Sequence, residues 1–404
     1  AITFWMFLET QSVFATGMIA GIFLVLTGSL GIWFGSLVDH HGKKRMMIAS
    51  SAASLVCYAL ALLALWSWPD VRAARVDSVG LWLFVLITMV GVIVGNIRMI
   101  ALPTLVTLLV PPADHARANG LVGMVSGIGF VTTSAISGYL VAWGGMEATL
   151  ALAMLFTLLA GVHLLFVRVN EPMRSSADAA PARVDLAGTV RVVGAIPGLF
   201  ALILFAAFNN FLGGVFMALM DAYGLSLMPV EQWGLLWAVV SVGFILAGAL
   251  IARTGLGTNP VRTLLLVNLA IWAVAALFTF QSSIPLVAIG CFLWMFLGPY
   301  AEAAEQTILQ RVVPFDRQGR VFGFAQSIES AASPLTAFLV APLAQFVFVP
   351  FMTDGAGADA IGDWFGRGPE RGIALVFILF GTIGVLAALA ALRSRSYRLL
   401  SQAY

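Results

Sequence analysis

Long apolar stretches, separated by short polar segments, follow one another along almost the whole chain. A helix needs about 20 apolar residues to cross a hydrocarbon layer of ~30 Å, and most of these stretches are that long. The alternation of apolar and polar positions that marks barrel strands is absent. Only helices and closed barrels satisfy every backbone polar group in lipid, so we predict helices throughout. The predicted spans cover residues 1–10, 14–38, 46–68, 80–108, 117–143, 147–168, 197–221, 232–252, 261–280, 284–310, 321–349 and 371–392.

The twelve predicted spans fall into two sets of six. Span one is about half a helix long, and Ala1 is not a start residue, so we expect a truncated first helix. The polar segment 170–191 separates spans six and seven, and residues 184–196 have the helical periodicity of a short amphipathic helix on the cytoplasmic surface. We therefore predict an all-α membrane protein. Its parts are an N-terminal six-helix half (1–168), a cytoplasmic linker with an amphipathic helix (169–196) and a C-terminal six-helix half (197–404).

Two short segments of the first half are repeated in the second. Segment A (35–45) and segment A′ (248–255) share two glycines and a leucine at an offset of 213 positions, but Ala252 replaces Asp39. Segment B (110–120) and segment B′ (313–323) share a Val-Pro pair, an arginine and a glycine at an offset of 203 positions. Internal repeats of this kind predict a duplicated unit, which is typical of transporters built from parallel repeats.

Composition and charge narrow the class further. Apolar residues make up 61% of the chain, charged residues 10%, and the mean hydropathy is +0.99, which excludes a soluble globular domain. With residues 39–45 placed inside, 16 of the 21 Lys and Arg residues fall in cytoplasmic segments. We therefore predict a multi-pass protein of the cell inner membrane with both termini cytoplasmic. The net charge of +2 reflects this asymmetry and does not indicate nucleic-acid binding.

The reactive side chains point to no cofactor. Cys57 and Cys291 both lie inside predicted spans, which indicates neither a disulfide framework nor a metal site. The four histidines lack metal-ligand spacing, and the chain has no Gly-rich phosphate loop, so ATP is not the expected energy source. An intramembrane serine protease is also disfavoured, because Ser126 has no Gly-x-Ser-x-Gly context. We expect no enzymatic activity, no metal and no cofactor.

Segment A has the form Gly-x-Leu-x-Asp-x-x-Gly-Lys-Lys, and it resembles the signature loop of the major facilitator superfamily. The segments Arg117-x-Asn119-Gly120, Asp185-Leu-x-Gly188, Gln310-Arg311-x-x-Pro314 and Gly366-x-Gly-Pro-Glu-Arg371 are similar to the macrolide-efflux type of drug:proton antiporter. This resemblance implies twelve helices in two pseudo-symmetric halves, a small-molecule substrate, protons and membrane lipids as partners, and a monomer. Two features depart from the family pattern. Span five lacks the antiporter proline, and Arg98 lies unusually near Pro103.

A gating loop is the first candidate site. Asp39, at the end of span two, can accept hydrogen bonds from the N-terminus of a neighbouring helix, where the helix dipole favours a negative charge. In this fold the neighbour is span eleven, which begins near Arg320. We predict a latch that stabilises one access state; the alternative is an ordinary capped loop with positively charged anchors. The gating residues are Gly35, Asp39, Gly42, Lys43 and Lys44.

Three glutamates inside predicted spans are candidates for proton coupling. Glu302 and Glu305 lie one turn apart on span ten, and Glu329 lies about eight residues into span eleven. A carboxyl group in hydrocarbon must be neutral, paired or in contact with water. We predict that these glutamates carry protons and that Arg98 on span four is their counter-ion. The alternative is a structural ion pair, or solvent contact at the end of a long helix.

Polar residues near mid-bilayer are candidates for the substrate cavity. Asn209 and Asn210 lie about a dozen residues into span seven, where amides either face a cavity or hold helices together. Tyr300 on span ten is a further cavity candidate. The leading hypothesis is a proton-driven exporter of amphipathic or lipophilic small molecules that works by alternating access. The alternative is a dedicated exporter of a siderophore or lysophospholipid, with drugs as incidental substrates.

Overall fold

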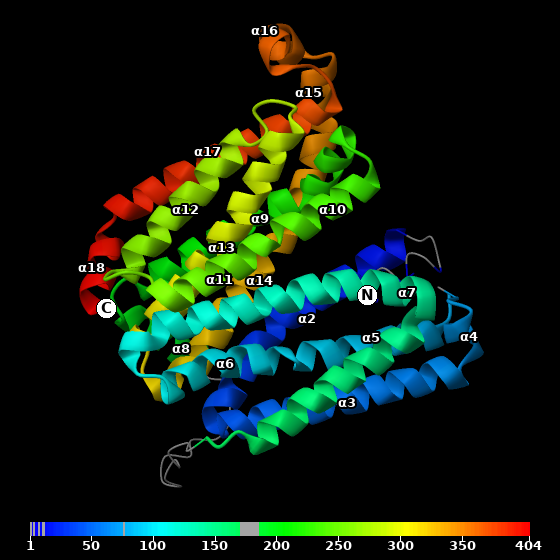
Figure 1. The fold of residues 1–404 in the computed structure, drawn as a ribbon, viewed down its shortest axis with the longest axis vertical. Helices are drawn as coiled ribbons and strands as arrows, with labels where there is room; N and C mark the ends of the chain where they lie inside the picture. Colours follow the sequence, from blue (N-terminus) through cyan, green and yellow to red (C-terminus); the bar gives the residue numbers. More distant parts are fainter. Residues whose placement is uncertain (1, 3–4, 7–8, 10–12, 76, 170–185) are drawn as a thin grey trace. The chain divides into compact units, whose positions relative to one another are not determined.

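The computed structural model describes residues 2, 5–6, 9, 13–75, 77–169 and 186–404, and the regular structure of that part of the chain is helical (Figure 1). The prediction of an all-α protein is confirmed. By its internal contacts the chain divides into two compact units. Unit 1 contains residues 1–109, 132–190 and 313–327, and unit 2 contains residues 110–131, 191–312 and 328–404.

Eight helices of the described residues are long and apolar enough to cross a membrane. They correspond to eight of the twelve predicted spans, and the arrangement of twelve helices in two six-helix halves stays a prediction. The predicted first span and the polar part of the predicted linker lie mostly outside the described residues. The eight helices are Lys43–Ser67, Val79–Leu109, Trp143–Phe166, Leu199–Leu227, Gln232–Thr254, Pro260–Leu277, Ile284–Val312 and Pro369–Arg393.

Unit 1 is held together by close packing between α3 and the helices that follow it. The hydroxyl of Ser50 donates to the carbonyl of Val94 and that of Ser54 to the carbonyl of Gly91, both at 2.8 Å, so buried polar groups are satisfied inside lipid-exposed helices. The helices of unit 1 are α2 (Val13–His40), α3 (Lys43–Ser67), α4 (Pro69–Arg72), α5 (Val79–Val94), α6 (Asn96–Leu109), the later part of α7 (His115–Phe166), the start of α8 (Leu186–Ala195) and, after the turn Phe315–Arg317, the start of α14 (Gln318–Leu343).

Helix α7 contains two of the predicted spans. Its backbone turns at Gly145, where φ is 60° and ψ is −157°, and helical geometry resumes directly afterwards. An L-residue with a side chain is strained at such a φ, so glycine is required at this position. The spans predicted at 117–143 and 147–168 therefore follow one another without a loop.

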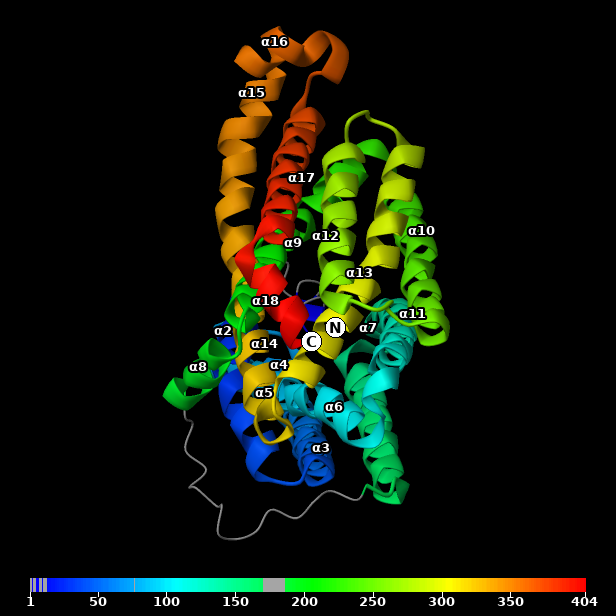
Figure 2. The same cartoon turned by 90° about the vertical axis from the view of Figure 1, so that its left-hand side faces the viewer.

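Unit 2 is organised around an aromatic core. Phe216 stacks on Phe377 with ring centroids 4.7 Å apart, and Trp272 packs beside Phe216 at 5.9 Å. Helices α12 and α17 lie side by side in both views (Figure 1 and Figure 2). The helices of unit 2 are the start of α7, the end of α8, α9 (Leu199–Leu227), α10 (Val230–Val240), α11 (Val242–Thr254), α12 (Pro260–Leu277), α13 (Ile284–Val312), the later part of α14, α15 (Val349–Thr353), α16 (Ala356–Phe365), α17 (Pro369–Arg393) and α18 (Arg395–Ala403), with short turns at Pro112–Asp114 and Ala344–Phe348.

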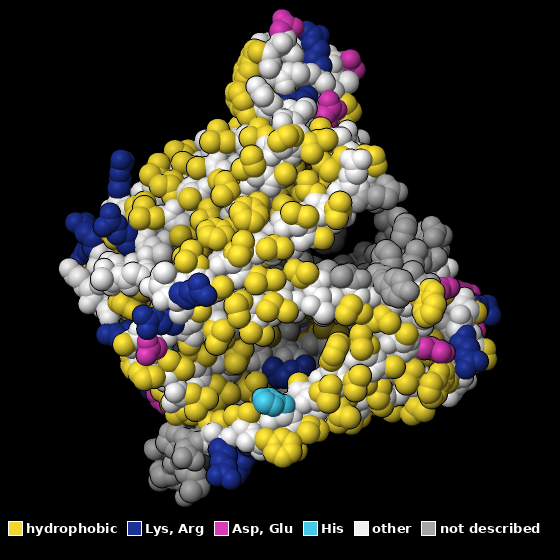
Figure 3. Space-filling model, in the orientation of Figure 1, with side chains coloured by type: hydrophobic (Ala, Val, Ile, Leu, Met, Phe, Trp, Pro, Cys, Tyr) yellow, Lys and Arg dark blue, Asp and Glu magenta, His cyan; other side chains and the backbone are white. Residues whose placement is uncertain are grey.

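The outer faces of these helices are apolar. Figure 3 shows hydrophobic side chains over α12 and α17 and over α10 and α11. On the last two, exposed apolar residues recur at helical spacing: Leu235, Val239, Val242, Leu246 and Leu250. Such a stripe would be unfavourable in water and is favourable against lipid tails. The fold is that of a membrane protein.

Arg371 fixes the start of α17. It is 1% exposed, and its guanidinium donates to the carbonyls of Thr279 (3.1 Å) and Phe280 (2.9 Å). It also stacks over the Phe365 ring at 3.8 Å from the centroid. One side chain therefore joins the ends of α12, α16 and α17.

Replacing Arg371 by alanine is expected to destabilise the protein by about 3 kcal/mol or more, because two buried carbonyls lose their donor and a cavity is left. The measurement is thermal unfolding of the purified protein in detergent. Arg367→Ala is the matched control, since Arg367 is exposed and pairs only with the exposed Asp363, a contact worth little. Equal losses for the two variants would contradict this role for Arg371.

Candidate functional site

The repeated segments A and B′ contact each other in unit 1. A Cβ atom on Gly35 of α2 would lie 2.9 Å from the Cα of Arg320, and one on Gly323 would lie 3.0 Å from the Cα of Gly35. These distances leave no room for a side chain, and backbone atoms cannot yield as a flexible side chain can. The two glycines therefore set the approach of α2 to the start of α14.

Segments A′ and B contact each other in the same way in unit 2. A Cβ atom on Gly248 of α11 would lie 2.6 Å from the Cα of Met124, and one on Gly120 of α7 would lie 2.6 Å from the Cβ of Ile251. Each segment of one predicted half thus packs on a segment of the other. This exchange is why unit 1 takes residues 313–327 and unit 2 takes residues 110–131. The division of the chain into halves at 169–196 stays a prediction.

Asp39 reaches the first turn of α14. Its Oδ1 accepts from the backbone N–H of Gly319 at 2.7 Å, and its Oδ2 accepts from the N–H of Arg320 at 2.8 Å and from its Nε at 3.3 Å. The Asp39 side chain is 0% exposed. The two backbone N–H groups have no partner within the helix, and they and the positive end of the helix dipole stabilise the negative charge of the buried carboxylate. The structure thus brings Asp39 to the helix end expected from the sequence, and its gating role stays a prediction.

The other residues of the predicted gating loop hold nearby elements of unit 1. The Nζ of Lys43 lies 4.8 Å from the centre of the Phe315 ring, a cation–π contact. The Nζ of Lys44 donates to the carbonyl of Leu165 at 3.2 Å. Gly42 directly precedes α3. Its φ of −60° and ψ of 130° are open to any residue, because the chain simply enters α3 from an extended conformation.

The contact between segments A′ and B has a pair of amide side chains where the contact between A and B′ has the Asp39 carboxylate. This amide pair was not predicted from the sequence. The Nδ2 of Asn119 donates to Oε1 of Gln310 at 2.9 Å and to Oγ1 of Thr307 at 2.8 Å, and Nε2 of Gln310 donates back to Oδ1 of Asn119 at 3.2 Å. All three side chains are buried. Ala252, the counterpart of Asp39, has no polar side chain to offer at this interface. Asn119 and Gln310 both lie in the segments that resemble the macrolide-efflux type, and this resemblance was the signal in the sequence that could have pointed to them.

Two of the three predicted proton carriers meet in unit 2. The side chains of Glu305 on α13 and Glu329 on α14 lie close enough to interact, and Glu302 lies near enough to both to act on them electrostatically. Glu302 is exposed, whereas Glu305 and Glu329 are half-buried. The role of these glutamates in proton coupling stays a prediction.

The predicted counter-ion lies in the other unit. The Nη1 of Arg98 on α6 donates to the hydroxyls of Ser50 at 3.1 Å and Ser51 at 3.4 Å, both on α3. The pairing of Arg98 with the glutamates stays a prediction. Within the described part of the chain, no three His, Cys, Asp or Glu side chains are grouped as metal ligands would be.

The cavity candidates have different surroundings. Asn209 accepts from the indole N–H of Trp272 and thereby joins α9 to α12, which favours the helix-holding role over the cavity role for this residue. Asn210 is exposed and donates to the carbonyl of Ala206 at 3.1 Å. Tyr300 is half-buried, and its ring follows Phe292 and Phe296 along α13 at a spacing of one turn.

The chain matches a known family over most of its length. Residues 1–337 match the family described as the Major Facilitator Superfamily. The fold is similar to a bacterial homologue of the iron transporter ferroportin in an outward-facing state, with a TM-score of 0.69 at 16% identity, over 96% of this chain and 93% of that one.

Two relatives match most of this chain at low sequence identity. Macrolide efflux protein A of Streptococcus pyogenes is 21% identical over 360 residues, which cover 86% of this chain and 85% of that protein. An uncharacterised MFS-type transporter of Sinorhizobium fredii is 26% identical over 371 residues, which cover 89% of this chain and 80% of that protein.

Proposed function

The chain belongs to the Major Facilitator Superfamily, and we propose that it exports amphipathic or lipophilic small molecules by proton antiport. It is a membrane transporter and not an enzyme. The similarity to macrolide efflux protein A over most of both chains supports efflux as the direction and an amphipathic molecule as the substrate.

The observation that carries the proton-coupling proposal is the electrostatic contact between Glu305 on α13 and Glu329 on α14, both of them half-buried. Two neighbouring carboxyl groups resist simultaneous ionisation, because like charges repel and both are partly removed from water. Glu302 lies one turn before Glu305 on the same face of α13. Proton binding therefore favours the arrangement in which α13 and α14 stay together, and proton loss favours their separation.

Helix α14 offers a direct connection from the proton site to the latch. Asp39 binds the N–H groups of Gly319 and Arg320 in the first turn of this helix, and Glu329 lies ten residues further along it. At ~1.5 Å rise per residue the two sites are about 15 Å apart on one rigid element. A shift of α14 that separates the carboxyl pair would act on both contacts, which is the coupling that antiport needs.

The proposal extends to orientation and substrate. We place segments A, A′, B and B′ on the cytoplasmic side of the cell inner membrane, so their contacts hold the protein closed to the cytoplasm. The aromatic stripe of Phe292, Phe296 and Tyr300 on α13 offers stacking surfaces to an apolar substrate. In this scheme two pseudo-symmetric six-helix halves rock about the substrate, and the protein works as a monomer.

Transport by purified protein in proteoliposomes tests the proposal. A panel of lipophilic cations, neutral amphiphiles and zwitterions is measured with and without an imposed pH gradient, and a protonophore serves as the control. We expect a subset of compounds to move against the proton flux and to stop when the gradient is collapsed. Transport of every compound at a rate indifferent to the gradient would rule out proton antiport.

A further inference from the structure

Segments B and B′ share a side-chain contact that closes the turn before a helix, α7 in segment B and α14 in segment B′. In segment B′, Nε2 of Gln318 donates to the carbonyl of Val313 at 3.1 Å. In segment B, Nε2 of His115 donates to the carbonyl of Val110 at 3.0 Å. The two side chains are 203 positions apart, which is the offset of the repeat. The duplicated contact therefore has an amide in one copy and an imidazole in the other.

The surroundings of His115 suit a neutral imidazole. A carbonyl only accepts hydrogen bonds, so Nε2 carries the proton of the neutral ring and Nδ1 has the lone pair. The residue is 2% exposed, and Nδ1 has no hydrogen-bond partner in the part of the chain that the structure describes. A second proton on this ring would create a buried, charged N–H donor without an acceptor, which is unfavourable. The amide of Gln318 takes up no proton, so the other copy of the contact lacks this sensitivity.

The position of His115 lets it act on the contact between segments A′ and B. Asn119, which pairs with Gln310 on α13, lies one turn further along α7 and on the same face. Gly120, next to it, packs against Ile251 of segment A′. A displacement of the first turn of α7 therefore acts on both contacts.

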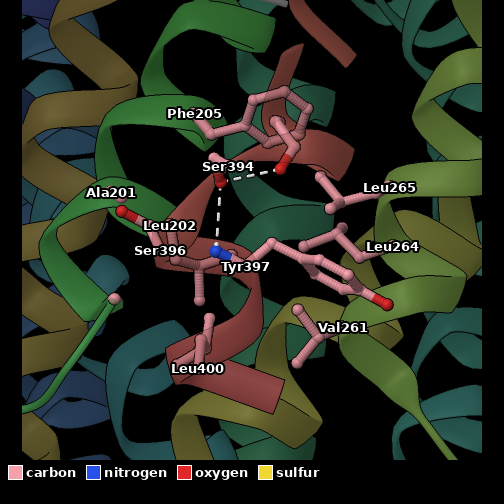
Figure 4. A pocket seen from close by; sticks show the side chains of 12 residues that line it. Ala201, Leu202, Phe205, Val261, Leu264, Leu265, Ser394, Ser396, Tyr397 and Leu400 are labelled. Atoms are coloured by element: carbon pink, nitrogen blue, oxygen red, sulfur yellow. Dashed lines mark hydrogen bonds between the residues drawn. The ribbon is translucent and has the colours of Figure 1, made fainter. Parts of the chain in front are cut away.

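A cation at the end of α13, Arg311, acts on the ring of His115 electrostatically. Its Nε donates to the backbone oxygen of Tyr404 at 3.2 Å, and its guanidinium lies over the Tyr404 ring, 5.2 Å from the centroid. Tyr404 follows α18, which packs with α9 and α12 around an apolar cleft (Figure 4) and is anchored there by Leu400, 3% exposed. Helix α18 therefore keeps Arg311 from turning away from a protonated histidine.

The acidic residues near segment B have another partner or lie further away. Asp114 directly precedes the histidine, but its carboxylate pairs with Arg117 at 3.3 Å, and both side chains are about half exposed. Helix α11, which packs on segment B, carries one charged residue, Arg253 in its last turn, and this is another cation. The nearest acid on α13 is Glu305, six residues before Arg311. A second proton on the imidazole would therefore meet more positive than negative charge.

We propose that His115 is a proton-binding site that loosens the contact between segments A′ and B in mild acid. When the contact opens, the ring meets water, where histidine has its ordinary pKa of about 6.5. In the closed contact burial lowers the pKa of His115, Arg311 lowers it further, and the bond to Val110 offsets part of this. The closed contact is therefore fully stable above about pH 6.5 and loses stability as the pH falls below this value, because the open form binds more protons.

Hydrogen–deuterium exchange of the full chain in neutral detergent, read by mass spectrometry, tests this site. Exchange in residues 110–120 and 248–255 is compared between the wild type and His115→Gln at each pH, so that the chemical exchange rate, which itself depends on pH, cancels. We expect the wild-type segments to open about tenfold more often at about pH 5.5 than at about pH 7.5, while the variant stays constant. Glutamine should keep the bond to Val110, because Gln318 makes the same bond to Val313.

The matched control is His163→Gln, which removes an exposed histidine from the last turn of the same helix and should keep the wild-type response. Thermal unfolding at neutral pH identifies a variant that fails to fold, in which case the wild-type rates, corrected with those of unstructured peptides, still decide. Wild-type segments that open equally at both pH values would overturn the proposal. An equal response in folded His115→Gln, or its loss in His163→Gln, would place the titrating group elsewhere and overturn it too. The measurement needs no substrate and no gradient, so its outcome is independent of the proposed proton antiport.

Discussion

Replacing Asp39 by asparagine is expected to lower the transport rate about tenfold or more while the amount of folded protein stays nearly constant. The amide keeps one acceptor but turns an NH₂ group toward a backbone N–H of Gly319 or Arg320, which then lacks a partner. An unsatisfied buried donor costs about 1–3 kcal/mol, and the loss falls only on the state in which α2 and α14 are joined. Initial transport rates in proteoliposomes measure the effect.

The duplicated interface supplies the control for Asp39. Ala252→Asn at the equivalent position should leave the rate within about twofold, because the contact there already lacks a carboxylate and is held by Asn119 and Gln310 instead. Equal sensitivity at positions 39 and 252 would contradict the latch. Gly35→Ala tests the same contact without changing charge, and Gly213→Ala is its control, because a Cβ on Gly213 meets nothing within 4 Å.

Replacing Glu305 or Glu329 by glutamine is expected to abolish the stimulation of transport by a pH gradient. Glutamine can form a hydrogen bond between α13 and α14, since its amide both donates and accepts, but it cannot exchange a proton. Exchange of substrate across the membrane without a gradient should therefore continue. Glu302→Gln should have a smaller effect, because Glu302 is more exposed than the half-buried Glu305 and Glu329.

Glu147→Gln is the matched control for the glutamates. Glu147 is exposed and accepts from the indole N–H of Trp66 at 3.2 Å, a bond that glutamine can also accept. The measurement compares substrate flux with and without the gradient for each variant. If the variants at 302, 305 and 329 all kept full gradient-driven transport, the proton site would have to be sought elsewhere, including in the first span.

The helices could be predicted from the sequence because each is a long apolar run between polar or Gly/Pro-containing segments. The span predicted at 284–310 is α13 (Ile284–Val312), and that predicted at 261–280 contains nearly all of α12 (Pro260–Leu277). Composition fixes such boundaries, since a charged residue is costly in hydrocarbon. The break predicted between the spans 117–143 and 147–168 falls at Gly145, although the sequence did not show that the two helices join there without a loop.

Side-chain partners were harder to predict than helices. The sequence pointed to the contact of Asp39 with the start of α14. A carboxylate at a helix end needs hydrogen-bond donors, and the family resemblance of segment A implied that the neighbouring helix is span eleven. The sequence shows that Asn209 lies in a span, but it does not show how that helix is rotated about its axis. The rotation decides that Trp272 is the partner of Asn209. The same reason hid the pair of Asn119 and Gln310, which lie 191 residues apart.

The exchanged packing of segments A with B′ and A′ with B resembles the interface of a two-fold homodimer whose subunits have been joined end to end. In a homodimer every substitution appears in both copies of a contact. In a fused chain each copy can be changed alone, and here one copy depends on a buried charge and the other on neutral amides. Acid or a single substitution can therefore weaken one junction and leave its twin intact.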